Sequence, residues 1–116
     1  MDPVSLALQV PDAQPWIGVD LDATLFHHDF GNHLSPIGEP IPAMVNQVKD
    51  WIQEGKKVKI FTARADHPEE APKIQDSLNA VGLFGLEITS HKDQHMTALY
   101  DDKAHHVIPN TGKIVS

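Results

Sequence analysis

The sequence contains no cysteine among its 116 residues. This absence excludes a disulfide framework, a thiolate metal site and a cysteine nucleophile. The sequence also has no apolar run long enough to span a bilayer, and its start, Met1-Asp2-Pro3, lacks the basic and apolar regions of a signal peptide. We therefore expect a soluble protein of the cytoplasm with no membrane partner.

Positive charge is scarce, with 9 Lys and Arg residues against 16 Asp and Glu residues and a formal net charge of −7. This balance disfavours a nucleic-acid backbone as a general partner. A small anion can bind only where something local, such as a metal ion, overcomes the negative field. The length and the 41% hydrophobic content are typical of one globular domain. We expect an N-terminal lead-in over residues 1–15 and a single domain over residues 16–116.

Strand and helix patterns alternate along the chain. Apolar runs predict strands at residues 16–20, 57–61 and 86–89, with shorter strands near 99–100 and at 106–108. Apolar residues repeated every three or four positions predict helices over residues 42–54 and 72–81, and a short helical piece over 94–99. This alternation predicts an α/β fold, a three-layer Rossmann-like arrangement with a parallel sheet flanked by helices on both faces. Such sheets bind ligands beyond the carboxyl ends of their strands.

Charged and hydroxyl side chains follow the predicted strands. Asp20 and Asp22 end the first strand, and a spacing of two in an extended chain puts both carboxylates on one side. Thr62, Lys92 and the pair Asp101-Asp102 follow later strands. Taken singly, such residues are usually turn formers or solvated charges. Two acidic pairs at one edge call for a hard cation such as Mg²⁺, and the threonine and lysine then provide donors for an anion bound to it. These are the groups that phosphoryl transfer requires.

Four motifs in order resemble the signatures of the haloacid-dehalogenase-like superfamily of phosphohydrolases. Asp20-Leu21-Asp22-Ala23-Thr24 resembles the first signature, Asp-x-Asp-x-Thr, although Ala23 stands where the family usually has glycine. Phe61-Thr62-Ala63-Arg64 resembles the second signature, Lys92 the third and Tyr100-Asp101-Asp102 the fourth. The match extends from about residue 16 to residue 109. It is similar, more narrowly, to small capless members from bacteria and their phages.

The resemblance implies a nucleophile, an acid and base, and a metal site. Asp20 would attack phosphorus and form an aspartyl-phosphate. Asp22 would protonate the leaving oxygen and later activate water, while its backbone carbonyl contacts Mg²⁺. Asp101 would ligate the metal, and Asp102 is the second candidate ligand or an outer partner. Asp20, Asp22, Asp101 and Asp102 are thus the expected metal-site residues.

The resemblance also implies a phosphate-binding set. Thr62 and the amide of Ala63 would bind phosphoryl oxygens, Lys92 would neutralise charge on the nucleophile and the intermediate, and Thr24 would orient the first loop. The segment between Thr24 and Pro42 is too short for a folded cap, so we expect an open site. An open site suits a large substrate, a range of small phosphate esters, or closure by a second subunit of a homo-oligomer.

The function that we predict is Mg²⁺-dependent hydrolysis of a phosphate monoester. A receiver-like signalling module is an alternative, although in those domains the Thr and Lys come late in the chain. A non-catalytic phosphate-binding or metal-binding domain is another, and phosphorylated nucleic-acid ends stay among the candidate substrates. His27 and His28 follow the first signature and are candidates for substrate contact, whereas surface or packing roles are favoured for the other histidines, including His33.

Overall fold

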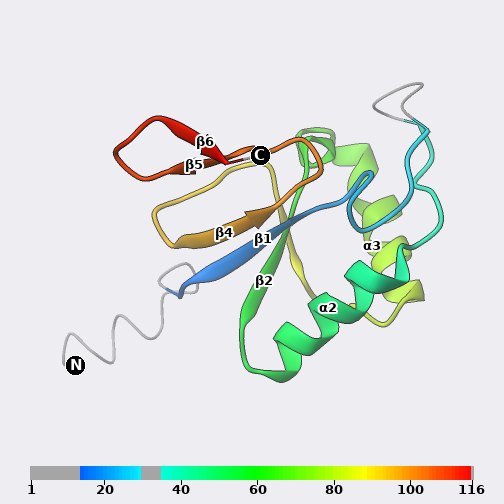
Figure 1. Ribbon diagram of the computed structural model, residues 1–116. Coiled ribbons are helices and arrows are strands. Elements are labelled where there is room, and N and C mark those ends of the chain that lie inside the picture. The colour runs from blue at the N-terminus through cyan, green and yellow to red at the C-terminus, as the bar shows by residue number, and fades with distance from the viewer. Residues whose placement is uncertain (1–13, 30–34, 116) are drawn as a thin grey trace, which may run out of the picture.

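The computed structural model describes residues 14–29 and 35–115 (Figure 1). The expected lead-in over residues 1–15 lies almost entirely outside this range, and so does His33. The elements are, in order, β1 (Trp16–Asp20), α2 (Pro42–Gln53), β2 (Lys57–Phe61), the 3₁₀ turns η2 (Ala63–Asp66) and η3 (Pro68–Glu70), α3 (Ala71–Ala80), β3 (Glu87–Thr89), β4 (Met96–Tyr100), β5 (His106–Ile108) and β6 (Lys113–Val115).

Four parallel strands form the central sheet in the order β3-β2-β1-β4. The predicted strands at 16–20 and 57–61 are confirmed, and α2 ends one residue before the predicted helix. Proline in the first turn of α2 and Gly55 just beyond its end mark its limits, as expected for a helix that starts and stops at these residues. The structure therefore confirms an α/β fold with a parallel sheet flanked by helices.

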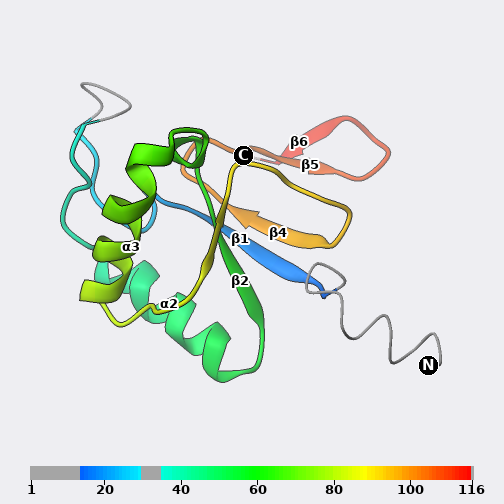
Figure 2. The ribbon, with the colours of Figure 1, turned by 180° about the vertical axis from the view of Figure 1, so that it is seen from behind.

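Both long helices pack on the same face of the sheet (Figures 1 and 2). Alternate residues of β1 and β2 join residues of α2 and α3 in one buried core: Ile17, Val19, Val58, Ile60, Val45, Val48, Ile74 and Leu78. Within the described residues, the prediction of helices on both faces is therefore wrong. The strands β1, β2 and β3 advance in one direction across the sheet, and right-handed crossovers then place both helices on one side.

The opposite face of the sheet is crossed by the connection between β3 and β4. Trp16 Nε1 donates a hydrogen bond to Asp93 Oδ1 at 2.9 Å, and the buried Lys59 ammonium lies 3.0 Å from Glu87 and 4.5 Å from the centre of the Trp16 ring. The predicted helical piece at 94–99 is wrong, because this segment pairs with β1 as strand β4. Pairing along the sheet edge overrides the local pattern.

The last two strands form a separate antiparallel hairpin. The predicted strand at 106–108 is confirmed as β5, but it pairs with β6 and not with the parallel sheet. Asn110 and Gly112 in the turn both have positive φ, at 63° and 71°, the conformations that Asn and Gly adopt most readily. The hairpin extends away from the α/β body (Figure 1).

Candidate active site

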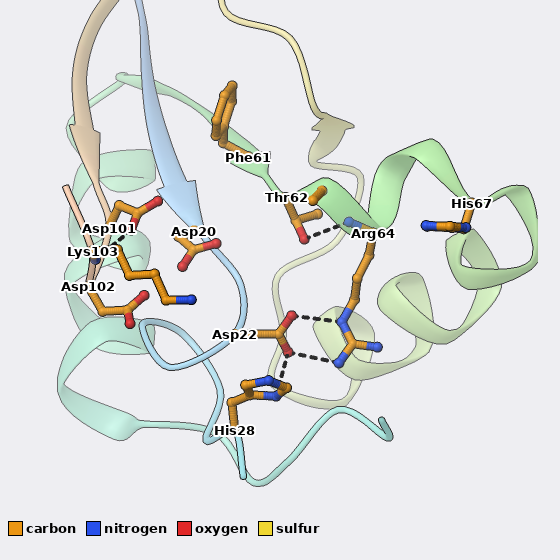
Figure 3. A pocket seen from close by; sticks show the side chains of 11 residues that line it. Asp20, Asp22, His28, Phe61, Thr62, Arg64, His67, Asp101, Asp102 and Lys103 are labelled. Atoms are coloured by element: carbon orange, nitrogen blue, oxygen red, sulfur yellow. Dashed lines mark hydrogen bonds and ion pairs between the residues drawn. The ribbon is translucent and has the colours of Figure 1, made fainter. Parts of the chain in front are cut away.

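An open cavity of about 330 Å³ lies at the carboxyl edge of the sheet, among the segments that follow β1, β2 and β4 (Figure 3). It brings together most of the residues predicted from sequence. The predicted residues that line it are Asp20, Asp22, Thr62, Ala63, Asp101 and Asp102, together with the candidate His28. Four further lining residues carried no predicted role: Phe61, Arg64, His67 and Lys103.

Three carboxylates meet in this cavity. One oxygen from each of Asp20, Asp101 and Asp102 lies within 4.8 Å of the others. Burial, the negative charge of Asp101 and a hydrogen bond with Asp102 together raise the pKa of Asp20 to about 7, and burial is the largest of these causes. Crowded carboxylates stay charged only at a cost, which a proton or a cation can remove. The cluster therefore has the oxygen donors and the excess negative charge that favour a bound cation.

Thr24 connects the loop after β1 to the turn after β4. Its hydroxyl accepts a hydrogen bond from the backbone N–H of Asp102 at 3.1 Å. The same oxygen lies 3.4 Å from Asp20 Oδ2 and 3.5 Å from Asp102 Oδ1. The Thr24 hydroxyl has one hydrogen to donate and lies within reach of both carboxylates, so it links the loop after β1 to the turn after β4.

Ala23 adopts the left-handed backbone conformation that glycine favours. Its φ is 65°, and its N–H donates to the carbonyl of Phe26 at 2.7 Å. The N–H groups of Leu25 and Phe26 both donate to the carbonyl of Leu21. The backbone thus forms a tight turn directly after β1, with alanine bearing strain that glycine would avoid.

The side chain of Asp22 is turned away from the three-carboxylate cluster (Figure 3). Its oxygens lie 2.7 Å from Arg64 Nε and 3.0 Å from Arg64 Nη2, and one lies 3.6 Å from His28 Nδ1. Both Asp20 and Asp22 line the cavity, but the carboxylate of Asp22 is outside the cluster that Asp20 forms with Asp101 and Asp102, so the expectation of one paired site holds only in part. β1 ends at Asp20, and the turn that follows breaks the alternation on which that expectation rested.

Arg64 is the main residue of the site that sequence reasoning missed. Its side chain is 3% exposed, and besides Asp22 it contacts Glu70 Oε1 and the carbonyl of Ser35, both at 2.6 Å. Glu70 is buried as well and also pairs with Lys73 at 3.0 Å. A buried guanidinium is tolerated only with such partners. The available signal was an arginine three residues after an apolar strand, with an acid six residues later.

Thr62 and Ala63 lie where the second strand ends. The Thr62 hydroxyl is buried and accepts a hydrogen bond from the N–H of Arg64 at 3.2 Å, which caps η2. The Thr62 N–H donates to the carbonyl of Thr89 on β3. Ala63 begins η2 and is exposed at the cavity. Both residues line the cavity, and Figure 3 shows Thr62 at the wall across from Asp101 and Asp102.

Lys92 is exposed and is not among the residues that line the cavity. The lysine that does line it is Lys103, directly after the acidic pair. The sequence analysis chose Lys92 as the phosphate-binding lysine because of its place in the order of the motifs. It did not consider that Lys103 directly follows the acidic pair Asp101-Asp102.

Comparisons of the chain with protein-family models, with curated proteins and with solved structures find no match. The resemblance to a phosphohydrolase superfamily therefore depends on the motifs and the geometry alone. None of the helices in residues 14–29 and 35–115 has the length and apolar character needed to cross a bilayer.

Proposed function

We propose that this protein is a Mg²⁺-dependent phosphohydrolase of the haloacid-dehalogenase-like type that cleaves phosphate monoesters. The observation that carries the proposal is the meeting of Asp20 with Asp101 and Asp102 in one cavity. Asp20 is more than 80 positions before Asp101 and Asp102 in the chain, and the first and fourth signatures assign the three residues to one centre. Thr62, from the second signature, lines the same cavity.

The donor set fits magnesium. Asp20, Asp101 and Asp102 offer only carboxylate oxygens, the hard ligands that Mg²⁺ takes, and the raised pKa of Asp20 reflects burial and nearby negative charge that a cation would offset. These three residues would hold the ion, with the backbone carbonyl of Asp22 as a further candidate. The bound ion would neutralise charge on the phosphoryl oxygens.

The protein's own residues account for the two chemical steps. A carboxylate oxygen of Asp20 attacks phosphorus, the bond from phosphorus to the ester oxygen breaks, and Asp22 gives that oxygen a proton. In the second step Asp22 takes a proton from water, the water oxygen attacks phosphorus, and the bond to Asp20 breaks. Inorganic phosphate leaves, and both carboxyl groups return to their starting states.

The remaining side chains position the reacting groups. Arg64 contacts both oxygens of Asp22 and so orients its carboxyl group. Thr62 and the amide of Ala63 bind phosphoryl oxygens at the opposite wall. The cavity is open, so its substrates are small phosphate esters or a terminal phosphate on a larger molecule. A phosphorylated nucleic-acid end belongs to the second group. An open cavity also suits closure by a second subunit.

Phosphate release tests the proposal directly. We expect the protein to hydrolyse p-nitrophenyl phosphate with millimolar Mg²⁺, and EDTA to abolish the activity. Asp20→Asn removes the nucleophile and lowers kcat by at least about a thousandfold. Asp76→Asn, which changes an exposed aspartate of α3 outside the cavity, keeps the wild-type rate.

A panel of nucleotides, sugar phosphates and phosphorylated DNA ends extends the test. No release from any of these substrates, or an Asp20→Asn variant as active as the wild type, contradicts the proposal. A stable phosphorylated protein without turnover would support a receiver-like module. Binding of phosphate or metal without hydrolysis would support a non-catalytic domain.

A further inference from the structure

Two lysines, Lys92 and Lys103, are candidates for the side chain that neutralises charge on the phosphoryl group at the proposed site. We infer that Lys103, rather than Lys92, is the cation that faces the phosphoryl group at Asp20. The inference rests on the proposed function, and it departs from the assignment that the order of the motifs implies. It names a phosphoryl-binding residue that is different from the lysine of the third signature.

The strand order separates the two lysines. Each follows its strand by three residues, Lys92 after β3 and Lys103 after β4. β4 is hydrogen-bonded to β1, which carries Asp20, whereas β3 lies on the far side of β2. Two strand spacings put β3 about 10 Å from β1, against about 5 Å for β4. Lys103 therefore starts from the strand nearer the nucleophile.

The chain that follows Lys92 is held towards the other end of β1. Asp93 Oδ1 accepts hydrogen bonds from Trp16 Nε1 at 2.9 Å and from the N–H of His95 at 2.8 Å. The N–H of Trp16 in turn donates to the carbonyl of His95 at 3.1 Å. Trp16 begins β1 and Asp20 ends it, about 13 Å apart in an extended strand. Two bonds from Trp16 thus hold Asp93 and His95, which follow Lys92, beside the amino end of β1. His91, which precedes Lys92, is bonded to Thr89 at the carboxyl end of β3.

The chain around Lys103 is fixed at the cavity itself. Its N–H donates to Asp101 Oδ1 at 2.7 Å, and the preceding N–H of Asp102 donates to the Thr24 hydroxyl. Figure 3 shows the Lys103 side chain extending from this turn towards Asp20. An ammonium group on a flexible stem is well suited to follow phosphoryl oxygens between reactant and intermediate. The same charge offsets the carboxylates when phosphate enters.

Paired variants test the inference. Lys103→Met keeps the length of the apolar stem and removes the charge, and we expect it to lower kcat/KM for p-nitrophenyl phosphate by about a hundredfold or more. Lys92→Met should cause a much smaller loss, and Lys103→Arg should recover part of the activity. Lys113→Met in β6, outside the cavity, is the matched control for loss of a surface lysine. Thermal unfolding checks that each variant is folded.

Anion binding gives a readout that is independent of turnover. In the presence of Mg²⁺, the affinities for inorganic phosphate and for orthovanadate should fall in Lys103→Met by about tenfold or more and change much less in Lys92→Met. A loss at Lys92 equal to or larger than that at Lys103 overturns the inference, and so does a wild-type protein that binds neither anion. If Asp20→Asn abolishes activity while Lys103→Met matches the wild type, the inference is wrong and the proposed function stands. If Asp20→Asn is fully active, the proposed function itself fails.

Discussion

At the scale of single residues, the chemistry of the site depends on where each charge is held. Asp20 lies with two other carboxylates and has a raised pKa, while Asp22 is paired with a guanidinium on both oxygens. The two aspartates are separated by only one residue, yet their surroundings are different. Attack on phosphorus requires the ionised form of Asp20, which a cation bound among the three carboxylates would favour.

Ala23 supplies a prediction at this scale. Its φ of 65° costs an L-residue about 1 kcal/mol or more, which glycine avoids. Glycine loses more backbone entropy on folding, so Ala23→Gly should raise the free energy of unfolding by a net of about 0.5 kcal/mol. Urea denaturation measures the change. Ala43→Gly in helix α2 is the control and should lower the same quantity by about 0.5 kcal/mol. A loss of stability in Ala23→Gly would contradict the strain.

At the scale of elements, Arg64 joins three segments that sequence order separates. From the start of η2 it contacts the loop after β1 through Asp22, the loop before α2 through Ser35, and η3 through Glu70. Hydrogen bonds from a rigid planar fork fix the relative positions of these segments. The wall of the cavity is therefore held by a buried ion network and not by apolar packing alone.

Removing Arg64 should loosen this wall. Arg64→Met leaves the buried Glu70 with one partner, and we expect the free energy of unfolding to fall by about 3 kcal/mol. Lys73→Met removes the other partner of Glu70, but that lysine is 64% exposed, so the loss should stay below about 1 kcal/mol. Urea denaturation of the two variants gives the comparison. Equal, small losses would show that the network does not stabilise the fold.

At the scale of the whole molecule, the three-carboxylate cluster couples stability to pH and to metal. Without metal, the pKa of Asp20 rises on folding from 3.8 to about 7, so between these values the folded chain holds a proton that the unfolded chain releases. The free energy of unfolding contributed by Asp20 therefore falls as pH rises from about 4 to about 7. Asp20→Asn should flatten this decline.

Urea denaturation in EDTA across this pH range measures the effect, with Asp76→Asn as a control that keeps the decline. Adding Mg²⁺ above pH 7 should restore stability in the wild type, by about 2.7 kcal/mol at a hundred times its Kd. The same addition should have little effect on Asp20→Asn. Identical pH profiles for wild type and Asp20→Asn would contradict the raised pKa.

Much of the local structure could be predicted from the sequence. The strands 16–20 and 57–61 and the helix from Pro42 are signalled by apolar patterns with proline and glycine at their ends. The grouping of Asp20 with Asp101 and Asp102 also follows from sequence, because parallel strands end at one edge. The segment 94–99 was mispredicted because pairing with β1 outweighs its weak helical pattern.

What the sequence by itself determined is the first two strands, the acids that follow the strands and the order of the motifs, since these depend on local patterns and on spacing along the chain. Only the tertiary structure decided which side chains share the cavity. It turned Asp22 towards Arg64, held the chain that follows Lys92 at the amino end of β1, and brought Lys103 to the site. The reason is that the order of the strands in the sheet and the conformation of the turns after them set these positions, and neither can be predicted from the spacing of residues along the chain.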